Sequence, residues 1–402
     1  MKREIINYVF RNLKRRKGRT FLTALSIFIG ITTIFIFVSF GGGLYFYVKE
    51  LSSSSSIDKV VIQPKGAGFL PNLNSNFKLT EKEIRIIEKI PGVIKVSGIV
   101  FAPVEVSLDK EKSYTYLIAY NPSEPLILEV FNIKIERGRE LKKEDKNKIV
   151  MGYNYLLEKK IFTKKLDVNQ KIKIQNKEFT IIGFFESVGS PQDDAQVYIN
   201  IEDIKEIFPE KKEKYDWVVA KVDLNQIDET VKKIEEELRK ERKEKKGEES
   251  FSVQTFEDLI ASYSSALNII ILFVIAIALV SVLVSAVNTS NTMITSVLER
   301  YKEIGIMKSI GAKNSDILSI FLIESSLIGF FGGVVGVFLG YILSSIGGNI
   351  LFSLGYGFLK PFYHPFLFIG CILFAIITGA ISGMVPAIKA SKINPVDSLR
   401  YE

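Results

Sequence analysis

The chain has 402 residues, of which 47% are hydrophobic, and its formal net charge is +8. A positive balance of this size could indicate nucleic-acid binding, but the distribution of charge excludes it. Residues 47–259 hold 37 Lys and Arg against 38 Asp and Glu, so the excess lies in the short segments on either side. No folded region carries a basic patch, and we expect no nucleic-acid partner. The one cysteine, Cys371, excludes an intramolecular disulfide.

Four stretches carry no charged residue, and each is long enough for a membrane-spanning helix. They cover residues 20–48, 259–298, 325–359 and 361–388. The second stretch could hold two spans, but its polar ends frame one apolar core at 266–287, which favours four spans in total. The first is longer than the apolar part of a signal peptide and no cleavage-type sequence follows it, which favours a retained anchor.

Charge predicts the orientation of the spans. The segment 1–19, the loop after the second span and the C-terminal tail together hold fifteen Lys and Arg, whereas the loop between the third and fourth spans holds only Lys360. Short cytoplasmic segments collect basic residues, and long translocated domains are exempt from this rule. We therefore expect a multi-pass protein of the cell membrane, with both termini in the cytoplasm and one large domain outside it.

The expected elements follow in chain order. Residues 1–19 form a basic amphipathic helix on the lipid bilayer, and 20–46 form the first span. Residues 47–262 form a mixed α/β (α+β) extracytoplasmic domain of two subdomains, with an inserted subdomain at about 121–200. The remaining segments are span two (263–290), a cytoplasmic loop (291–315), span three (316–346), a short outer loop (347–364), span four (365–388) and a cytoplasmic tail (389–402).

Within the large domain, patterns of apolar residues indicate both helices and strands. Thr80 is an N-cap residue followed by acidic residues and an apolar stripe, which predicts a helix over 80–90. A second, highly charged helix is predicted over 228–246. Alternating residues predict strands at 58–63, 93–108, 114–120, 171–174 and 179–184, the last two joined as a hairpin.

Small residues recur at four-residue spacing in the last two spans, which allows helix backbones to approach closely in lipid. The pattern favours packing within the bundle over a seam between two copies. The glycines concerned are Gly329, Gly332, Gly333, Gly336, Gly340, Gly379 and Gly383.

Motifs for catalysis are missing from the sequence. It has no phosphate-binding G-x-x-x-x-G-K-[ST] and no H-E-x-x-H, and its one histidine, His364, has no partner pattern. Asp193 and Asp194 stand beside Gly189 and Pro191 in an expected turn. We predict no catalytic, cofactor-binding or metal-binding residues, and a chain that is not itself an enzyme. Glu324 is an acidic residue inside a span; a structural role is favoured over a functional one.

The segment 291–313 is the most distinctive in the chain. Val297, Tyr301 and Ile304 fall on one face of a short amphipathic helix, with Arg300 and Glu303 beside it. Such a helix in a cytoplasmic loop could rest on the membrane or dock in the groove of a soluble partner. Its mixed charge argues against simple adsorption to anionic lipid.

Residues 299–312, ERYKEIGIMKSIGA, resemble the signature of the FtsX-like permease domain of MacB-type ABC transporters. Residues 12–27 and 386–399 resemble the first span's entry and the C-terminal end of that family. The large domain resembles its periplasmic core domain through 137–139, 150–152, 179–184 and 197–200. The resemblance covers nearly the whole chain in the family's order.

The resemblance implies a division of labour. A cytoplasmic ABC ATPase subunit binds and hydrolyses ATP, and this chain binds no cofactor of its own. The permease pairs as a homodimer or paralogous heterodimer and transmits ATP-driven motion, a mechanism called mechanotransmission, through a coupling helix at 295–310. Only 19 residues precede the first span, so the ATPase is expected on a separate polypeptide. The matching coupling residues are Val297, Glu299, Arg300, Tyr301, Glu303, Ile304, Gly305, Lys308, Gly311 and Ala312.

Two functions stay open at this point. The chain could be a permease for efflux or extrusion of peptides, drugs or lipids, with or without an extracytoplasmic adaptor. Alternatively, it could be an FtsX-like regulator of an extracytoplasmic enzyme such as a cell-wall hydrolase. The large two-part domain favours transport.

Overall fold

A computed structural model of the chain describes residues 9, 17–52, 57–66 and 77–400. Most of the basic helix expected at 1–19 lies outside these residues. The chain divides into two compact units. The helical unit contains the chain before Tyr45, Asn268–Ile350 and the chain from Leu359 onward; the α/β unit contains Tyr45–Leu267 and Leu351–Phe358.

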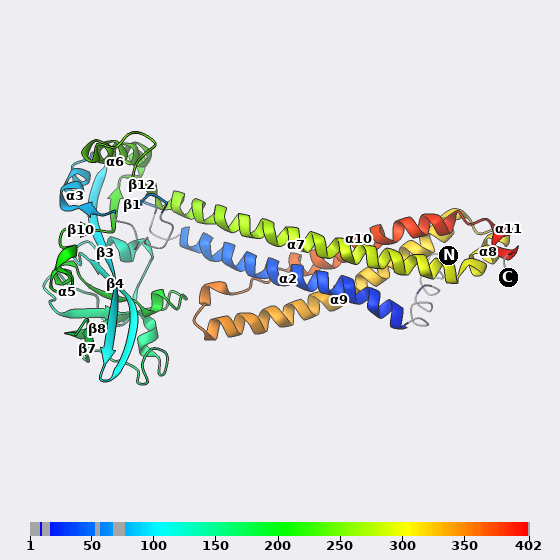
Figure 1. The fold of residues 1–402 in the computed structure, drawn as a ribbon, viewed down its shortest axis with the longest axis horizontal. Helices are drawn as coiled ribbons and strands as arrows, with labels where there is room; N and C mark the ends of the chain where they lie inside the picture. Colours follow the sequence, from blue (N-terminus) through cyan, green and yellow to red (C-terminus); the bar gives the residue numbers. More distant parts are fainter. Residues whose placement is uncertain (1–8, 10–16, 53–56, 67–76, 401–402) are drawn as a thin grey trace. The chain divides into compact units, whose positions relative to one another are not determined.

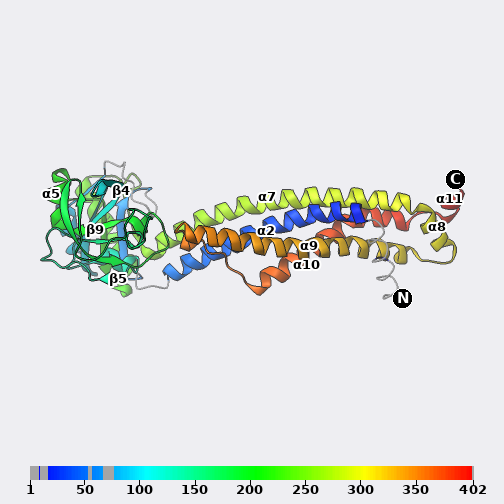
Figure 2. The same cartoon turned by 90° about the horizontal axis from the view of Figure 1, so that it is seen from below.

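Four long helices build the helical unit and run side by side within it (Figures 1 and 2). They are α2 (Lys17–Ser52), α7 (Phe256–Glu299), α9 (Asn314–Ser353) and α10 (Pro365–Ser391). Among the described residues, four segments are long and apolar enough to cross a membrane. They are Thr23–Val48, Asn268–Glu299, Asn314–Ser353 and Pro365–Ser391. The expected fold class, four spans with a mixed α/β domain, is confirmed.

The helix that contains the second span is longer than the sequence pattern indicates. It begins at Phe256, directly after strand β12 (Phe251–Thr255). Its start is fixed by a reciprocal cap: the Asp258 N–H donates to Thr255 Oγ1 at 3.0 Å, and Thr255 Oγ1 donates to the Asp258 carboxylate at 2.7 Å. Such a cap satisfies backbone donors that a helix start leaves without partners, so α7 extends beyond its apolar core.

Glycines on α9 lie where two neighbouring helices pass closest. A Cβ on Gly336 would lie 2.9 Å from the carbonyl oxygen of Phe28 in α2. On the other side of α9, a Cβ on Gly329 would meet the carbonyl of Ala375 in α10. Gly332 and Gly340 also face α2, Gly333 also faces α10, and Gly379 and Gly383 of α10 face Ser325 of α9. All of these glycines therefore pack within one chain.

The α/β unit is built on a sheet that, in the described residues, has ten strands in the order β12-β1-β11-β3-β4-β9-β6-β8-β5, with β7 paired to β3 and β8. Short strands β2 (Leu79–Thr80) and β10 (Lys214–Tyr215) form a separate pair. The remaining strands are β1 (Lys59–Pro64), β3 (Val93–Leu108), β4 (Glu111–Tyr120), β5 (Ile135–Gly138), β6 (Lys148–Met151), β7 (Lys171–Ile174), β8 (Lys177–Phe185), β9 (Val197–Asn200) and β11 (Trp217–Val222).

The long strand β3 belongs to two lobes of this unit. Its first half pairs with β11, and its second half, from Val100, pairs with β4. The first lobe, with β12, β1 and β11, is covered by α3 (Glu81–Glu88) and α6 (Ile227–Arg242) (Figure 1). The second lobe holds the other strands, α4 (Leu126–Val130) and α5 (Ile204–Ile207). It starts within β3, before the residue near 121 expected from sequence, because the β3–β4 hairpin forms part of its sheet.

Candidate coupling site

The motif at 299–312 forms a break and a short helix. Helix α7 ends at Glu299, and α8 runs over Tyr301–Ser309. Between them, Arg300 has φ −108° and ψ 15°, so the backbone changes direction at this residue. The Arg300 side chain is only 3% exposed.

Arg300 joins three elements by its guanidinium group. Nη1 contacts Glu324 Oε2 of α9 at 3.0 Å, and Nε contacts Glu303 Oε2 of α8 at 3.2 Å. The guanidinium also lies 5.2 Å from the centre of the Phe321 ring on α9. A planar group with several donors can hold two carboxylates at once, which a lysine ammonium cannot do with the same geometry. Arg300 therefore fixes the direction in which α8 leaves α7.

Glu324 lies inside α9 and is 6% exposed. An unpaired carboxylate at this depth would be costly, but the contact with Arg300 neutralises it. The two charges depend on each other, because removing either leaves a buried charge behind. The acidic residue in the third span is thus part of the same site as the motif arginine.

The far end of α8 is attached to the chain's C-terminal segment. Lys308 Nζ donates to the carbonyl oxygens of Ser391 at 2.8 Å and Ile393 at 2.6 Å, where α10 ends. Helix α11 (Pro395–Arg400) also packs on α8. These carbonyls are left without intrahelical partners by the end of α10, so a lysine is a favourable donor to them.

The turn after α8 explains the end of the motif. Gly311 has φ +104°, a left-handed conformation that favours glycine. The Gly311 N–H donates to the Lys308 oxygen at 3.1 Å and the Ala312 N–H donates to the Met307 oxygen at 3.0 Å. This is the hydrogen-bond pattern of a glycine-ended helix, and it leads the chain into α9.

The structure places part of the expected apolar face inward. Val297 belongs to α7, and Val297 and Ile304 pack in the core of the helical unit, as does the backbone at buried Gly305. Tyr301 and Lys308 are half-buried. The exposed face of α8 and its following turn consists of Lys302, Glu303, Ile306, Ser309, Ile310 and Gly311. The single helical register assumed over 295–310 does not apply, because the break at Arg300 resets it.

The first lobe of the α/β unit receives both long helices at one edge of its sheet. Helix α2 precedes β1 in the chain, and β12 leads directly into α7. Strands β1 and β12 pair with each other over five residues of each strand, from Val60↔Thr255 to Pro64↔Phe251. Because the two strands share a hydrogen-bond ladder, a displacement of either helix reaches the same sheet edge.

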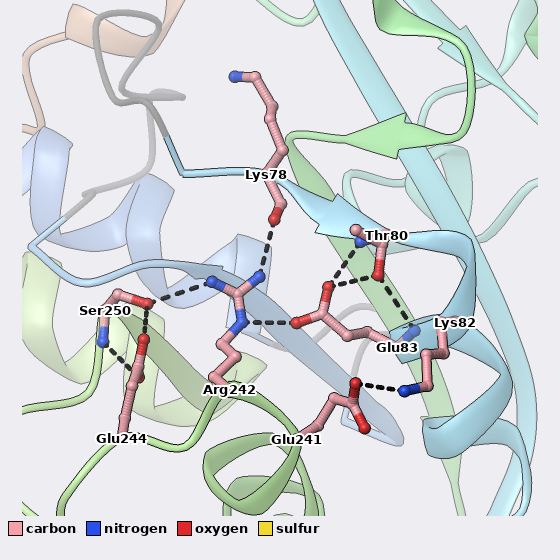
Figure 3. Close-up of polar contacts among 8 residues, drawn as sticks. All are labelled: Lys78, Thr80, Lys82, Glu83, Glu241, Arg242, Glu244 and Ser250. Carbon is pink, nitrogen blue, oxygen red and sulfur yellow. Dashed lines mark hydrogen bonds and ion pairs between the residues drawn. The ribbon is translucent and has the colours of Figure 1, made fainter.

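A network around Arg242 attaches α3 and α6 to that edge (Figure 3). Arg242 at the end of α6 contacts Glu83 of α3 at 2.5 Å through Nε. It also donates to the Lys78 carbonyl at 2.7 Å and to Ser250 Oγ at 3.2 Å, just before β12. Its guanidinium lies 4.1 Å from the centre of the Phe77 ring. One side chain thus joins the helices of the first lobe to the segment that leads into α7.

Comparison with known proteins agrees with this arrangement. The model of the MacB-like periplasmic core domain matches residues 20–239, and that of the FtsX-like permease C-terminal matches residues 261–395. An uncharacterized ABC transporter permease of Methanocaldococcus jannaschii is 34% identical over 99% of this chain and 98% of its own length. The uncharacterized ABC transporter permease YknZ of Bacillus subtilis is 27% identical, with 99% of each chain covered.

A fused relative and one solved structure complete the comparison. The macrolide export ATP-binding/permease protein MacB of Wolinella succinogenes is 27% identical over 99% of this chain but only 61% of its own length. The periplasmic region of MacB from Actinobacillus actinomycetemcomitans has a TM-score of 0.42 and 13% identity, covering 52% of this chain and 94% of that one.

The chain is a membrane protein with an extracytoplasmic α/β domain. It belongs to the family of ABC transporter permeases with a MacB-like periplasmic core domain and an FtsX-like permease domain.

Proposed function

We propose that this chain is the permease subunit of an ABC complex and transmits motion from a separate cytoplasmic ATPase to its α/β unit. The observation that carries the proposal is the attachment of α8. Arg300 fixes its start to α7 and α9, and Lys308 fixes its end to the end of α10. A load on α8 therefore reaches three of the four long helices without a flexible segment between them.

The ATPase would dock on the exposed face of α8. Ile306 is 51% exposed and Ile310 is 81% exposed, although both are large apolar side chains. Helix-in-groove recognition uses such anchors, surrounded by charged residues that set orientation. Lys302 and Glu303 lie on the same exposed face and would serve that role. This orientation places both termini and α8 in the cytoplasm, with ATP bound by the partner.

The transported material would be taken up outside the cytoplasm, in the class of peptides, drugs or lipids. Those curated relatives whose printed names state an activity are exporters, of macrolides and of pyoverdine. This supports export over the alternative of regulating an extracytoplasmic enzyme. Two copies of the permease, alike or paralogous, would act with the ATPase.

Recovery of the ATPase with tagged full-length permease from membranes tests the docking face. Ile306→Glu and Ile310→Glu are expected to lower ATPase binding at least about tenfold, because a charge replaces an apolar anchor. Ile94→Glu is the matched control, since Ile94 is 58% exposed but lies in the α/β unit. Undiminished ATPase recovery with both α8 variants would contradict the assignment of α8.

A further inference from the structure

The loop between α9 and α10 makes specific contacts at each of its ends. Residues Leu351–Phe358 group with the α/β unit, whereas the chain from Leu359 onward groups with the helical unit. The loop, defined here as residues 354–364, therefore passes from one unit to the other. Among the functions assigned above, none uses it.

Helix α9 ends against the second lobe. The Tyr356 N–H donates to the Leu351 oxygen at 2.8 Å, and Gly355 has φ +99°, which together close the helix. Lys160 of the second lobe donates from Nζ to the carbonyl oxygen of Leu354 at 3.1 Å. The positive charge lies at the negative end of the helix dipole, where it is favourable.

The loop then lies against the turn that contains Gly189. The Phe358 N–H donates to the Gly189 carbonyl at 3.4 Å. A Cβ on Gly189, which has φ +79°, would lie 3.1 Å from the Phe358 nitrogen and 3.2 Å from Gly357 Cα. A Cβ on Gly355 would lie 3.2 Å from Cγ of Pro191. Two backbones approach this closely only because glycines lie on both sides.

Asp194 holds this turn in shape. Its carboxylate accepts hydrogen bonds from Ser187 Oγ at 2.6 Å and from the Val188 N–H at 2.7 Å, and the residue is 3% exposed. Asn154 supports the turn from behind by donating to the Pro191 carbonyl at 3.1 Å. The surface that the loop contacts is therefore a fixed part of the second lobe.

The other end of the loop is attached to α2 in the helical unit. The Phe362 N–H donates to the Ser39 carbonyl at 2.8 Å. Gly43, one turn further along α2, receives the Lys360 carbonyl so closely that any side chain there would overlap it. Gly42 beside it has only ordinary contacts with the Phe362 side chain.

From these contacts we infer that the α9–α10 loop is a third mechanical connection, which drives the second lobe while α2 and α7 drive the first. The inference rests on the proposed function, since it assigns one route of the motion that the ATPase supplies. It gives Lys160 and Gly189 a positioning role: they hold the loop on the lobe. In a productive cycle the contact stays closed, so the loop carries load.

A disulfide tests whether the contact exists in the membrane. In a Cys371→Ser background, Pro191→Cys with Gly355→Cys pairs a side chain whose Cβ lies 3.7 Å from the position a Cβ on Gly355 would take. This is within the range for disulfides. Oxidation of full-length protein in membranes is expected to give an intramolecular bridge, and neither single-cysteine variant should do so. Absence of the bridge would overturn the docking.

A second experiment separates the loop's role from the proposed function. An environment-sensitive dye is attached at Tyr114→Cys, which lies on the second lobe and is 78% exposed, in the Cys371→Ser complex with its ATPase. Gly189→Val is expected to reduce the ATP-dependent dye signal at least twofold without loss of ATPase recovery. Gly66→Val is the matched control, because Gly66 has a similar φ of +75° and open space around it.

The outcomes have distinct meanings. No ATP-dependent signal in the parent complex would contradict the proposed function itself. A full signal in Gly189→Val would overturn the loop's role and leave the proposed function intact. In the bridged variant, which is examined without the dye cysteine, ATP turnover and ATPase recovery are expected to match the parent; inhibition by the bridge would overturn the claim that the contact stays closed.

Discussion

Arg300 and Glu324 form a buried ion pair at 3.0 Å, although they lie 24 positions apart in the sequence. One residue ends the second long helix and the other lies inside the third. The pair connects the family motif to the bundle interior and explains why an acidic side chain is retained in a span. It also makes α8 part of a fixed joint, and its contribution can be measured.

Glu324→Gln is expected to destabilise the helical unit by about 3 kcal/mol, because it leaves the Arg300 charge buried without its closest carboxylate. The measurement is thermal labelling of Cys371, the chain's one thiol, which is 6% exposed in α10. Glu303→Gln is the control, since the Glu303 side chain is 59% exposed and exposed pairs contribute about 0–1 kcal/mol. Equal labelling temperatures for the two variants would contradict the pair's assigned weight.

Arg242→Lys is expected to destabilise the α/β unit by about 2 kcal/mol, since lysine cannot keep the contacts with Glu83, Lys78 and Ser250 together. Fluorescence of Trp217, the one tryptophan, reports unfolding of this unit in the full chain. Lys82→Ala removes the nearby pair with Glu241, in which Lys82 is 73% exposed, and should change stability by less than about 1 kcal/mol. The network would lose its assigned importance if Arg242→Lys behaved like Lys82→Ala.

Asp145 predicts acid sensitivity in the second lobe. Hydrogen bonds from Arg139, followed by those from Lys148 and the Lys142 N–H, hold the pKa of Asp145 well below its usual range. A carboxyl group whose pKa is lowered by folding stabilises the fold above its unfolded pKa, so this contribution is lost as pH falls below about 4. Asp145→Asn should therefore lower the free energy of unfolding at pH 7 by about 2 kcal/mol and have a smaller effect near pH 2. An equal effect at both pH values, measured by Trp217 fluorescence, would contradict this.

Local sequence signals predicted the elements whose cause is local. Thr80 and Glu83 form the capping box of α3, with the Thr80 N–H donating to Glu83 Oε2 at 2.7 Å. Gln175 and Asn176 both have positive φ and form the turn between β7 and β8, as expected from the hairpin pattern. His364, which carries no motif in the sequence, accepts a hydrogen bond from the Phe366 N–H and caps α10.

Features that depend on distant partners could not be read from one sequence. The inward direction of Arg300 depends on a helix break and on Glu324, and periodicity over 295–310 contains neither. The role of β3 in both lobes depends on its two successive partners, β11 and β4. The contact of Gly189 with the α9–α10 loop joins residues more than 150 positions apart, and the sequence indicated only that Gly189 lies in a turn.

The most direct test of the central claim is the ATP-dependent signal of a dye on Tyr114→Cys, in the Cys371→Ser permease reconstituted with its ATPase. If α8 receives the motion and the α/β unit delivers it, ATP should change the signal in the parent protein and in Ile94→Glu. The change should be lost in Ile306→Glu. An Ile306→Glu complex that responds to ATP as fully as the parent would contradict the account.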